Sequence, residues 1–164
     1  MRRSLMQGKT LYSVRLVLLG AFILSSLEVS AQPQSERAKQ LMALVDKAAA
    51  LIESKGKEAF PEFRKKDSEW YRDSTYIFVI DMKGTMLMHP VKPELEGKNQ
   101  MDLKDTNGKA FVKEMVDILK VRNSDWVEYM WPKPGETQSS RKLSYIRKAK
   151  LEGEEVIVGS GLYP

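Results

Sequence analysis

The chain has 164 residues with a net charge of +5, a length that suits one domain with a single hydrophobic core. It contains no cysteine and one histidine, which excludes a disulfide framework and the cysteine-rich or multi-histidine metal sites. Its basic residues are interleaved with acidic ones instead of forming a stripe, which argues against nucleic acid as a partner.

The first 31 residues have the pattern of a cleavable secretory signal. Basic residues precede an apolar run over residues 16–27, and Val29-Ser30-Ala31 gives a small-x-small ending. The run is shorter than the roughly 20 residues that cross a bilayer. We therefore expect cleavage after Ala31, a mature domain of residues 32–164 and a periplasmic or secreted location; an uncleaved anchor is the alternative. The signal carries four basic residues and one acidic residue, so the mature net charge is +2.

Two helices are predicted before any long strand. Apolar residues between 35 and 54 recur at three- and four-residue spacing, which predicts a long amphipathic helix. Ser35 is the expected N-cap, and Gly56 suits the left-handed position that ends a helix. A shorter helix is predicted within residues 57–66, where Pro61 limits its start.

Residues 76–90 predict a β-hairpin followed by a long loop. An apolar run over 76–80 and a short alternating run over 86–88 flank the turn residues 81–84. The loop then extends over residues 90–109, and loops of this length inside a compact domain are uncommon and usually functional. We expect it to lie over the sheet as a lid or pocket wall.

A third helix and three strands complete the predicted order. Helical periodicity covers residues 110–120, with Thr106 or Asn107 available as a cap. Three strands follow, at residues 125–131, 142–150 and 156–163. This order predicts an α+β fold in which one antiparallel sheet of about five strands has its helices gathered on one side. In the last strand Gly159 and Gly161 share a face, which leaves a smooth strip that a backbone or a ligand can approach.

Few residues could support catalysis. His89 would have to serve any nucleophilic triad, and no serine lies on a strand-to-helix elbow. Asp102 and Asp105 lie in a lysine-rich loop that lacks the spacing of a calcium site, so a solvated or capping role is the simpler interpretation. We therefore expect no catalytic residue, no metal site, no cofactor and no enzyme activity.

Four sequence blocks follow one another in register between residues 35 and 163. They are the hairpin with its loop through Asn99, the segment Asp102 to Lys109, the strand Trp126-Val127-Glu128-Tyr129-Met130-Trp131-Pro132 and the closing strand from Val156 to Tyr163. In order and spacing they resemble the single Cache domains, extracytoplasmic small-molecule sensor modules of bacteria and archaea. The resemblance implies a PAS-like Cache fold with a long N-terminal helix and a shorter helix packed on the sheet.

The resemblance also implies a site between the sheet and the long loop, commonly occupied by a short organic acid. We predict six ligand-binding residues: His89, Trp126, Tyr129, Trp131, Lys142 and Tyr145. A cation such as Lys142 would replace the water that a carboxylate loses on burial. Side-chain alternation places Trp126 opposite Tyr129, so we favour Tyr129 and Tyr145 for contact. A structural histidine bonded to a backbone carbonyl is an equal alternative for His89.

We therefore expect an exported sensor domain that binds a short carboxylate in signal transduction of the chemotaxis type, without an output domain of its own. A membrane receptor and a homodimer through the N-terminal helix are further candidate partners. The alternative is a structural or protein-interaction module whose pocket is filled by its own side chains. A buried cavity with an unpaired cation would favour binding, whereas a closed core with Lys142 and His89 exposed would favour the interaction module.

Overall fold

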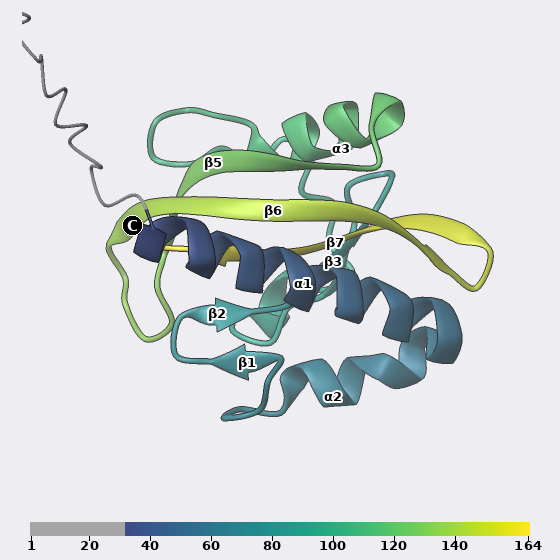
Figure 1. Cartoon of the computed structure of the whole chain (residues 1–164). Coiled ribbons are helices and arrows are strands. Elements are labelled where there is room, and N and C mark those ends of the chain that lie inside the picture. The colour runs from purple at the N-terminus through teal and green to yellow at the C-terminus, as the bar shows by residue number, and fades with distance from the viewer. Residues whose placement is uncertain (1–31) are drawn as a thin grey trace, which may run out of the picture. The chain divides into compact units, whose positions relative to one another are not determined.

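The computed structural model describes residues 32–164 (Figure 1), so the predicted signal lies outside the described residues. The elements are α1 (Gln32–Lys55), the 3-10 helix η1 (Gly56–Ala59), α2 (Phe60–Arg64), β1 (Tyr71–Arg72), β2 (Thr75–Tyr76), β3 (Phe78–Asp81), β4 (Met86–Met88), the 3-10 helix η2 (Pro93–Leu95), α3 (Phe111–Val121), β5 (Ser124–Pro132), β6 (Ser139–Leu151) and β7 (Glu154–Leu162). Within this part of the chain, no helix combines the length and the apolar character that crossing a membrane requires.

Helix α1 confirms the predicted amphipathic pattern. Leu41, Val45 and Ile52 are buried at intervals of four and seven residues, because such positions lie on one helix face. The helix begins at Gln32, so Ser35 lies inside it and is not its N-cap. Gly56 follows with φ of +61°, which confirms the left-handed position predicted for it.

Five strands form one antiparallel sheet, as predicted, and their order in it is β4-β3-β7-β6-β5. The 13-residue strand β6 pairs with β5 on one side and with β7 on the other. A separate ribbon of β1 and β2 was not predicted. Its strands have only two residues each, too few to show a period of two in the sequence.

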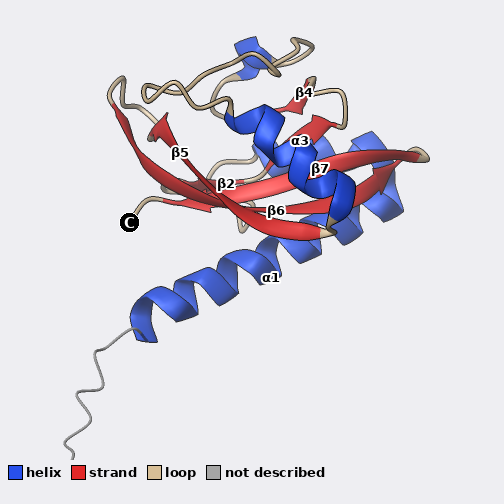
Figure 2. Cartoon of the chain, turned by 90° about the horizontal axis from the view of Figure 1, so that it is seen from above, coloured by secondary structure: helices blue, strands red, loops and turns tan. Residues whose placement is uncertain are grey.

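Helices cover both faces of the sheet, so the expectation that they gather on one side was wrong. Helix α1 packs on the face that carries Tyr145 and Val158, and α3 packs on the face that carries Ile146 and Ile157 (Figure 2). The reason is that β6 and β7 bury apolar side chains on both faces, and each face then needs its own cover. Helix α3 also has no side-chain cap, unlike the prediction, because its N-cap position is Ala110.

The long loop over residues 90–109 hydrogen-bonds both edge strands of the sheet. At the β4 edge, the Met86 amide donates to the Lys98 carbonyl at 3.1 Å, and the Gly97 amide donates to the Met86 carbonyl at 2.8 Å. At the β5 edge, the Met130 amide donates to Asp105 Oδ2 at 2.9 Å. The loop therefore spans the sheet from one edge to the other, over the face that carries α3.

The glycine strip of β7 is filled by side chains of this same chain. A Cβ atom added at Gly159 would lie 2.3 Å from Cζ of Phe78, and one added at Gly161 would lie 2.4 Å from Cε of Lys142. These separations are far inside normal van der Waals contact. The two glycines thus make room for Phe78 and for the stem of Lys142 on the α3 side of the sheet.

Gly159→Ala should lower the free energy of unfolding by about 1–3 kcal/mol, because the extra methyl group overpacks the site against the Phe78 ring. Urea unfolding would measure it. The same change in a Phe78→Leu background should cost clearly less, since the clashing ring is then absent. An equal cost in both backgrounds would show that contact with Phe78 is not the cause.

Candidate functional site

A small cavity lies between the sheet, α3 and the long loop. Its volume is about 20 Å³, and His89, Leu103, Phe111, Met115, Tyr129 and Trp131 are among the residues that line it. A cavity of this size has room for about one water molecule. Leu103 belongs to the long loop, which therefore forms a wall of the cavity as the sequence predicted.

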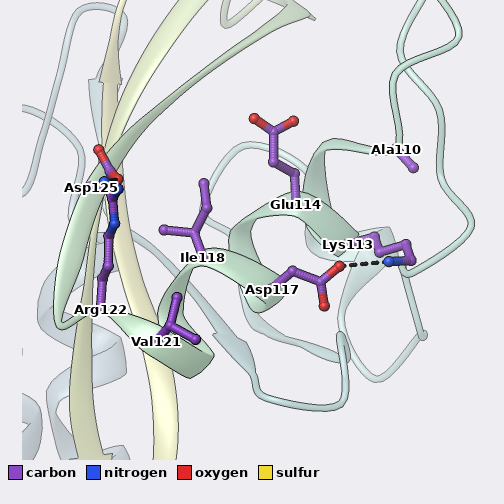
Figure 3. A pocket seen from close by; sticks show the side chains of 8 residues that line it. All are labelled: Ala110, Lys113, Glu114, Asp117, Ile118, Val121, Arg122 and Asp125. Atoms are coloured by element: carbon purple, nitrogen blue, oxygen red, sulfur yellow. Dashed lines mark hydrogen bonds and ion pairs between the residues drawn. The ribbon is translucent and has the colours of Figure 1, made fainter.

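A larger hollow of about 670 Å³ lies between α3 and the start of β5, but it brings no predicted residue together (Figure 3). Its two cations are both paired, Lys113 with Asp117 at 2.5 Å and Arg122 with Asp125. Such a groove has no unpaired charge to offer an anion, so the small cavity is the better candidate.

Lys142 does not line the small cavity itself but is buried next to Phe78 and Tyr129, which do, and it has no counter-ion among the described residues. Its side chain is 1% exposed, and Nζ donates a hydrogen bond to the Tyr76 hydroxyl at 2.8 Å. The ring centroids of Tyr76, Tyr163, Phe78 and Tyr129 lie 4.1, 5.5, 5.6 and 5.9 Å from Nζ. No carboxylate among the described side chains forms an ion pair with it. Burial lowers the pKa of Lys142 to about 7.

Strand register brings Lys142 to this position. Lys142 is the cross-strand partner of Tyr129 in β5, so both side chains point to the same face of the sheet. Ser144, two residues further along β6, shares that face and lies 3.1 Å from the Tyr129 hydroxyl, Oγ to Oη. Tyr129 also stacks on Phe111 of α3, with ring centroids 4.3 Å apart and planes 2° from parallel. Burial raises the pKa of Tyr129, so its hydroxyl stays neutral.

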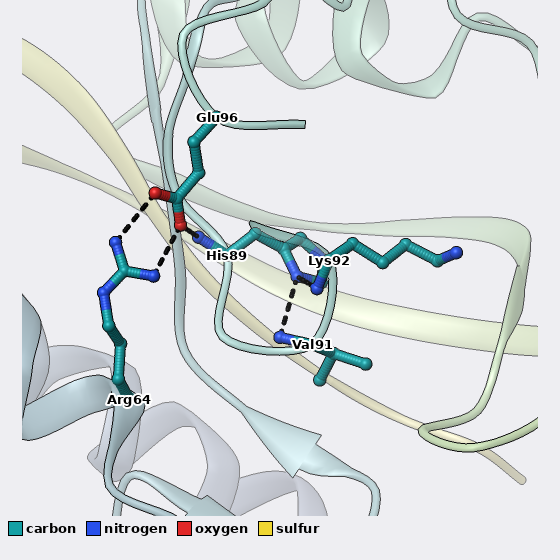
Figure 4. Close-up of polar contacts among 5 residues, drawn as sticks. All are labelled: Arg64, His89, Val91, Lys92 and Glu96. Carbon is teal, nitrogen blue, oxygen red and sulfur yellow. Dashed lines mark hydrogen bonds and ion pairs between the residues drawn. The ribbon is translucent and has the colours of Figure 1, made fainter. Parts of the chain in front are cut away.

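His89 lines the cavity as a neutral side chain of defined tautomer. Its Nδ1 accepts hydrogen bonds from the backbone amides of Lys92 at 3.0 Å and Val91 at 3.3 Å (Figure 4). Because Nδ1 is an acceptor, the ring proton must lie on Nε2. Burial and the positive charges of Lys142 and Lys92 lower the pKa of His89 to about 3. The expected carbonyl partner is thus replaced by two amide donors, and the ring can offer an N–H to a ligand.

The single histidine should therefore remain uncharged well below its ordinary pKa. Its folded pKa lies below its unfolded value, so the unfolded chain takes up this proton first and stability falls as the pH decreases from about 6.5 toward 3. Histidine ring ¹³C and ¹⁵N NMR shifts should show the Nε2–H tautomer at pH 7 and at pH 5, whereas the urea-unfolded chain titrates near 6.5. Titration of the folded protein near pH 6 would contradict the assignment.

Four of the six predicted residues come together: His89, Tyr129, Trp131 and Lys142 lie on the α3 face. Tyr145 and Trp126 lie on the α1 face instead, with their ring centroids 5.2 Å apart. The separation follows from alternation, because Tyr145 is an odd number of residues from Lys142 in the same strand. A ligand contact by any of the six residues stays a prediction.

Sequence reasoning missed Tyr76, Tyr163 and Phe111, whose rings enclose Lys142 or stack on Tyr129. Side-chain alternation could have identified Tyr76. It lies two residues before Phe78 in an apolar run, and residues at that spacing in an extended segment share a face. Phe111 begins α3, and only the tertiary packing of that helix places it beside Tyr129.

Residues 34–163 match the family model of the Cache domain. The chain belongs to the Cache domain family. Two solved structures support this: a periplasmic sensor domain of a chemotaxis protein is 32% identical with a TM-score of 0.70, covering 81% of this chain and 99% of that one. A Cache chemosensory domain studied for carboxylic acid recognition is 30% identical with a TM-score of 0.67, covering 80% of this chain and 97% of that one. These likenesses confirm the PAS-like Cache fold.

Two curated relatives place such Cache domains in receptors. The methyl-accepting chemotaxis protein McpP of Pseudomonas putida is 36% identical over 93 residues, which cover 57% of this chain and 17% of McpP. The sensor histidine kinase MctS of Rhizobium johnstonii is 31% identical over 93 residues, which cover 57% of this chain and 20% of MctS. The matched segment is thus a fifth or less of each relative. Residues 34–163 are thus a Cache sensor domain, a kind of ligand-binding module that chemotaxis and histidine kinase receptors use in signal transduction.

Proposed function

We propose that this Cache domain binds a short-chain carboxylate between the sheet and the long loop, with Lys142 as the anchor for the carboxylate. The observation that carries the proposal is the buried ammonium group of Lys142, which forms no ion pair within residues 32–164. A charge in that position is costly unless an opposite charge and hydrogen bonds compensate it. A bound anion would supply both.

The polar groups around the cavity favour a plain carboxylate over an amino acid or an amine. The lining residues include His89, whose Nε2–H is a donor, and no aspartate or glutamate, and the donor Lys142 lies next to two of them, Phe78 and Tyr129. The ammonium group of an amino acid would face Lys142 without a partner of opposite charge. Carboxylic acid recognition by a solved Cache domain of 30% identity supports the same ligand class.

The interaction module with a self-filled pocket is the second candidate, and the cavity of about 20 Å³ is the observation in its favour. Binding of a carboxylate requires the long loop or its side chains to move outward. The burial of Lys142 and His89 at 1% and 3% exposure favours binding, because an interaction module has no use for a buried unpaired cation.

Export after cleavage near Ala31, delivery of the ligand to a membrane receptor and the stand-alone state stay predictions. A homodimer through α1 also stays a prediction. Its apolar stripe packs on the sheet, and among the described side chains the large apolar residue that is exposed is Val121 of α3. Met42, Leu44 and Leu51 of α1 are only partly buried and are the apolar side chains that such a dimer could use.

Thermal unfolding of the purified chain against short carboxylates, amino acids and amines tests the proposal. A ligand at a hundred times its dissociation constant adds about 2.7 kcal/mol, a shift of a few degrees for a domain of this size. The shift should appear with carboxylates, vanish in Lys142→Met and persist in Lys150→Met, an exposed lysine of the same strand. A folded protein that responds to no carboxylate would refute the proposal and favour the interaction module.

A further inference from the structure

One carboxylate outside the cavity joins three parts of the chain. Glu96 follows η2 in the long loop, and Arg64 at the end of α2 donates to both of its oxygens, Nη1 to Oε1 at 2.6 Å and Nη2 to Oε2 at 2.8 Å (Figure 4). The backbone amide of His89 donates to Oε1 at 2.8 Å. The ion pair with Arg64 lowers the pKa of Glu96, so the carboxylate stays charged.

Three hydrogen bonds hold His89 at two of its atoms, the backbone nitrogen and Nδ1. Its backbone amide is bonded to Glu96, and its Nδ1 accepts the amides of Val91 and Lys92. Residues 89–96 therefore form a loop whose two ends are joined by the Glu96 carboxylate. With the backbone nitrogen and Nδ1 both fixed, the imidazole ring keeps one tautomer, and its Nε2–H points in one direction.

We infer that Glu96 and Arg64 are positioning residues of the ligand site, which hold the loop of residues 89–96 closed so that His89 presents its Nε2–H to the bound anion. The inference rests on the proposed function. Neither residue lines the cavity, so both act through His89. The bidentate geometry matters because it fixes the orientation of the Glu96 carboxylate as well as its position.

Other ion pairs of the chain provide a comparison. Lys113 and Asp117 form an exposed pair within α3, at four-residue spacing and with side chains 59% and 43% exposed. Asp117 also accepts a hydrogen bond from Lys120, and among the described residues the side chains of Lys113 and Asp117 form no hydrogen bond with the long loop or His89. In the Arg64–Glu96 pair, by contrast, Glu96 is 23% exposed and also accepts a backbone amide. Removing Asp117 is therefore a matched control for removing Glu96.

The test uses the full chain, acetate as the probe and two readouts: the acetate dissociation constant by calorimetry and the NMR shifts of the single histidine. Glu96→Ala and Arg64→Ala should each weaken acetate binding about tenfold, or about 1.4 kcal/mol, the net value of one hydrogen bond. Both should also convert the histidine signals from the Nε2–H tautomer to a mixture. Glu96→Gln, which keeps an acceptor for the His89 amide, should restore most of the affinity, and Asp117→Ala should match the wild type.

Wild-type affinity in Glu96→Ala would overturn the inference, whether or not the histidine tautomer changes. If the wild type binds no acetate, the proposed function fails for this probe, and unchanged histidine signals in Glu96→Ala would then overturn the positioning role separately. If Glu96→Ala fails to fold, Arg64→Ala removes the same ion pair by changing its more exposed member. Acetate affinity and the histidine NMR shifts are then measured in Arg64→Ala.

Discussion

Replacing Lys142 with methionine should abolish carboxylate binding and make the ligand-free domain more stable at pH 6. Lys142 has a pKa of about 7 in the folded protein against an ordinary value of 10.5. The difference corresponds to a cost of about 5 kcal/mol for keeping the buried ammonium charged. Methionine removes that cost but leaves the Tyr76 hydroxyl without its donor, a loss of about 1–3 kcal/mol. A net gain of about 2–4 kcal/mol is therefore expected.

The gain in the free energy of unfolding of Lys142→Met over the wild type should depend on pH. Because the folded pKa lies below the unfolded one, the cost is fully present below pH 7 and disappears as the pH rises toward 10.5. Urea unfolding of the wild type and Lys142→Met at pH 6 and pH 10 should thus show a large difference at the lower pH and a small one at the higher. Lys150→Met provides the control. A variant less stable than the wild type at pH 6 would mean that the folded protein stabilises the charge.

Carboxylate affinity should fall steeply as the pH rises above 7. A bound anion stabilises the charged lysine and returns its pKa toward the ordinary value, so the charged form binds and the neutral form does not. With a free pKa of about 7, the charged fraction, and with it the affinity, decreases about fiftyfold from pH 7 to pH 9.

The other titratable groups near Lys142 do not change charge in this range. His89 has a pKa of about 3, and the pKa values of Tyr76, Tyr129 and Tyr163 are raised by burial. Calorimetry in two buffers of different ionisation heat should show uptake of about half a proton at pH 7 and nearly one at pH 9. An affinity that stays constant between pH 7 and pH 9, without proton uptake, would exclude Lys142 as the anchor.

Hydrophobic periodicity predicted the helices and strands in which the same apolar pattern repeats along several helical turns or several strand residues. The long helix and the strands around Tyr129 and Lys142 were found in this way, because each repeats one pattern over eight residues or more. Which face each helix covers could not be read in the same way. Strands β6 and β7 are apolar on both faces, so their sequence is compatible with helices on either side.

The alternation of side chains along a strand was enough to predict which of the site residues share a face of the sheet. It was applied to the strand of Tyr129 but not to the strand of Lys142. Alternation correctly separates Trp126 from Tyr129, and the same reasoning applied to β6 separates Tyr145 from Lys142. The contact of Glu96 with Arg64 joins residues 32 positions apart, and no local pattern in the sequence encodes it. The same holds for the acceptor role of Nδ1 in His89, which depends on the backbone path after Pro90.

The long loop that hydrogen-bonds both edge strands has a consequence for solubility. A free sheet edge offers unpaired amides and carbonyls to which a neighbouring molecule can add a strand, the first step of aggregation. Here the Met86 amide and carbonyl at one edge are hydrogen-bonded to the Lys98 carbonyl and the Gly97 amide. At the other edge the Met130 amide donates to the Asp105 carboxylate. Leu103 of the same loop lines the cavity, so a substitution that displaced the whole loop from the sheet would expose both edges together with the cavity.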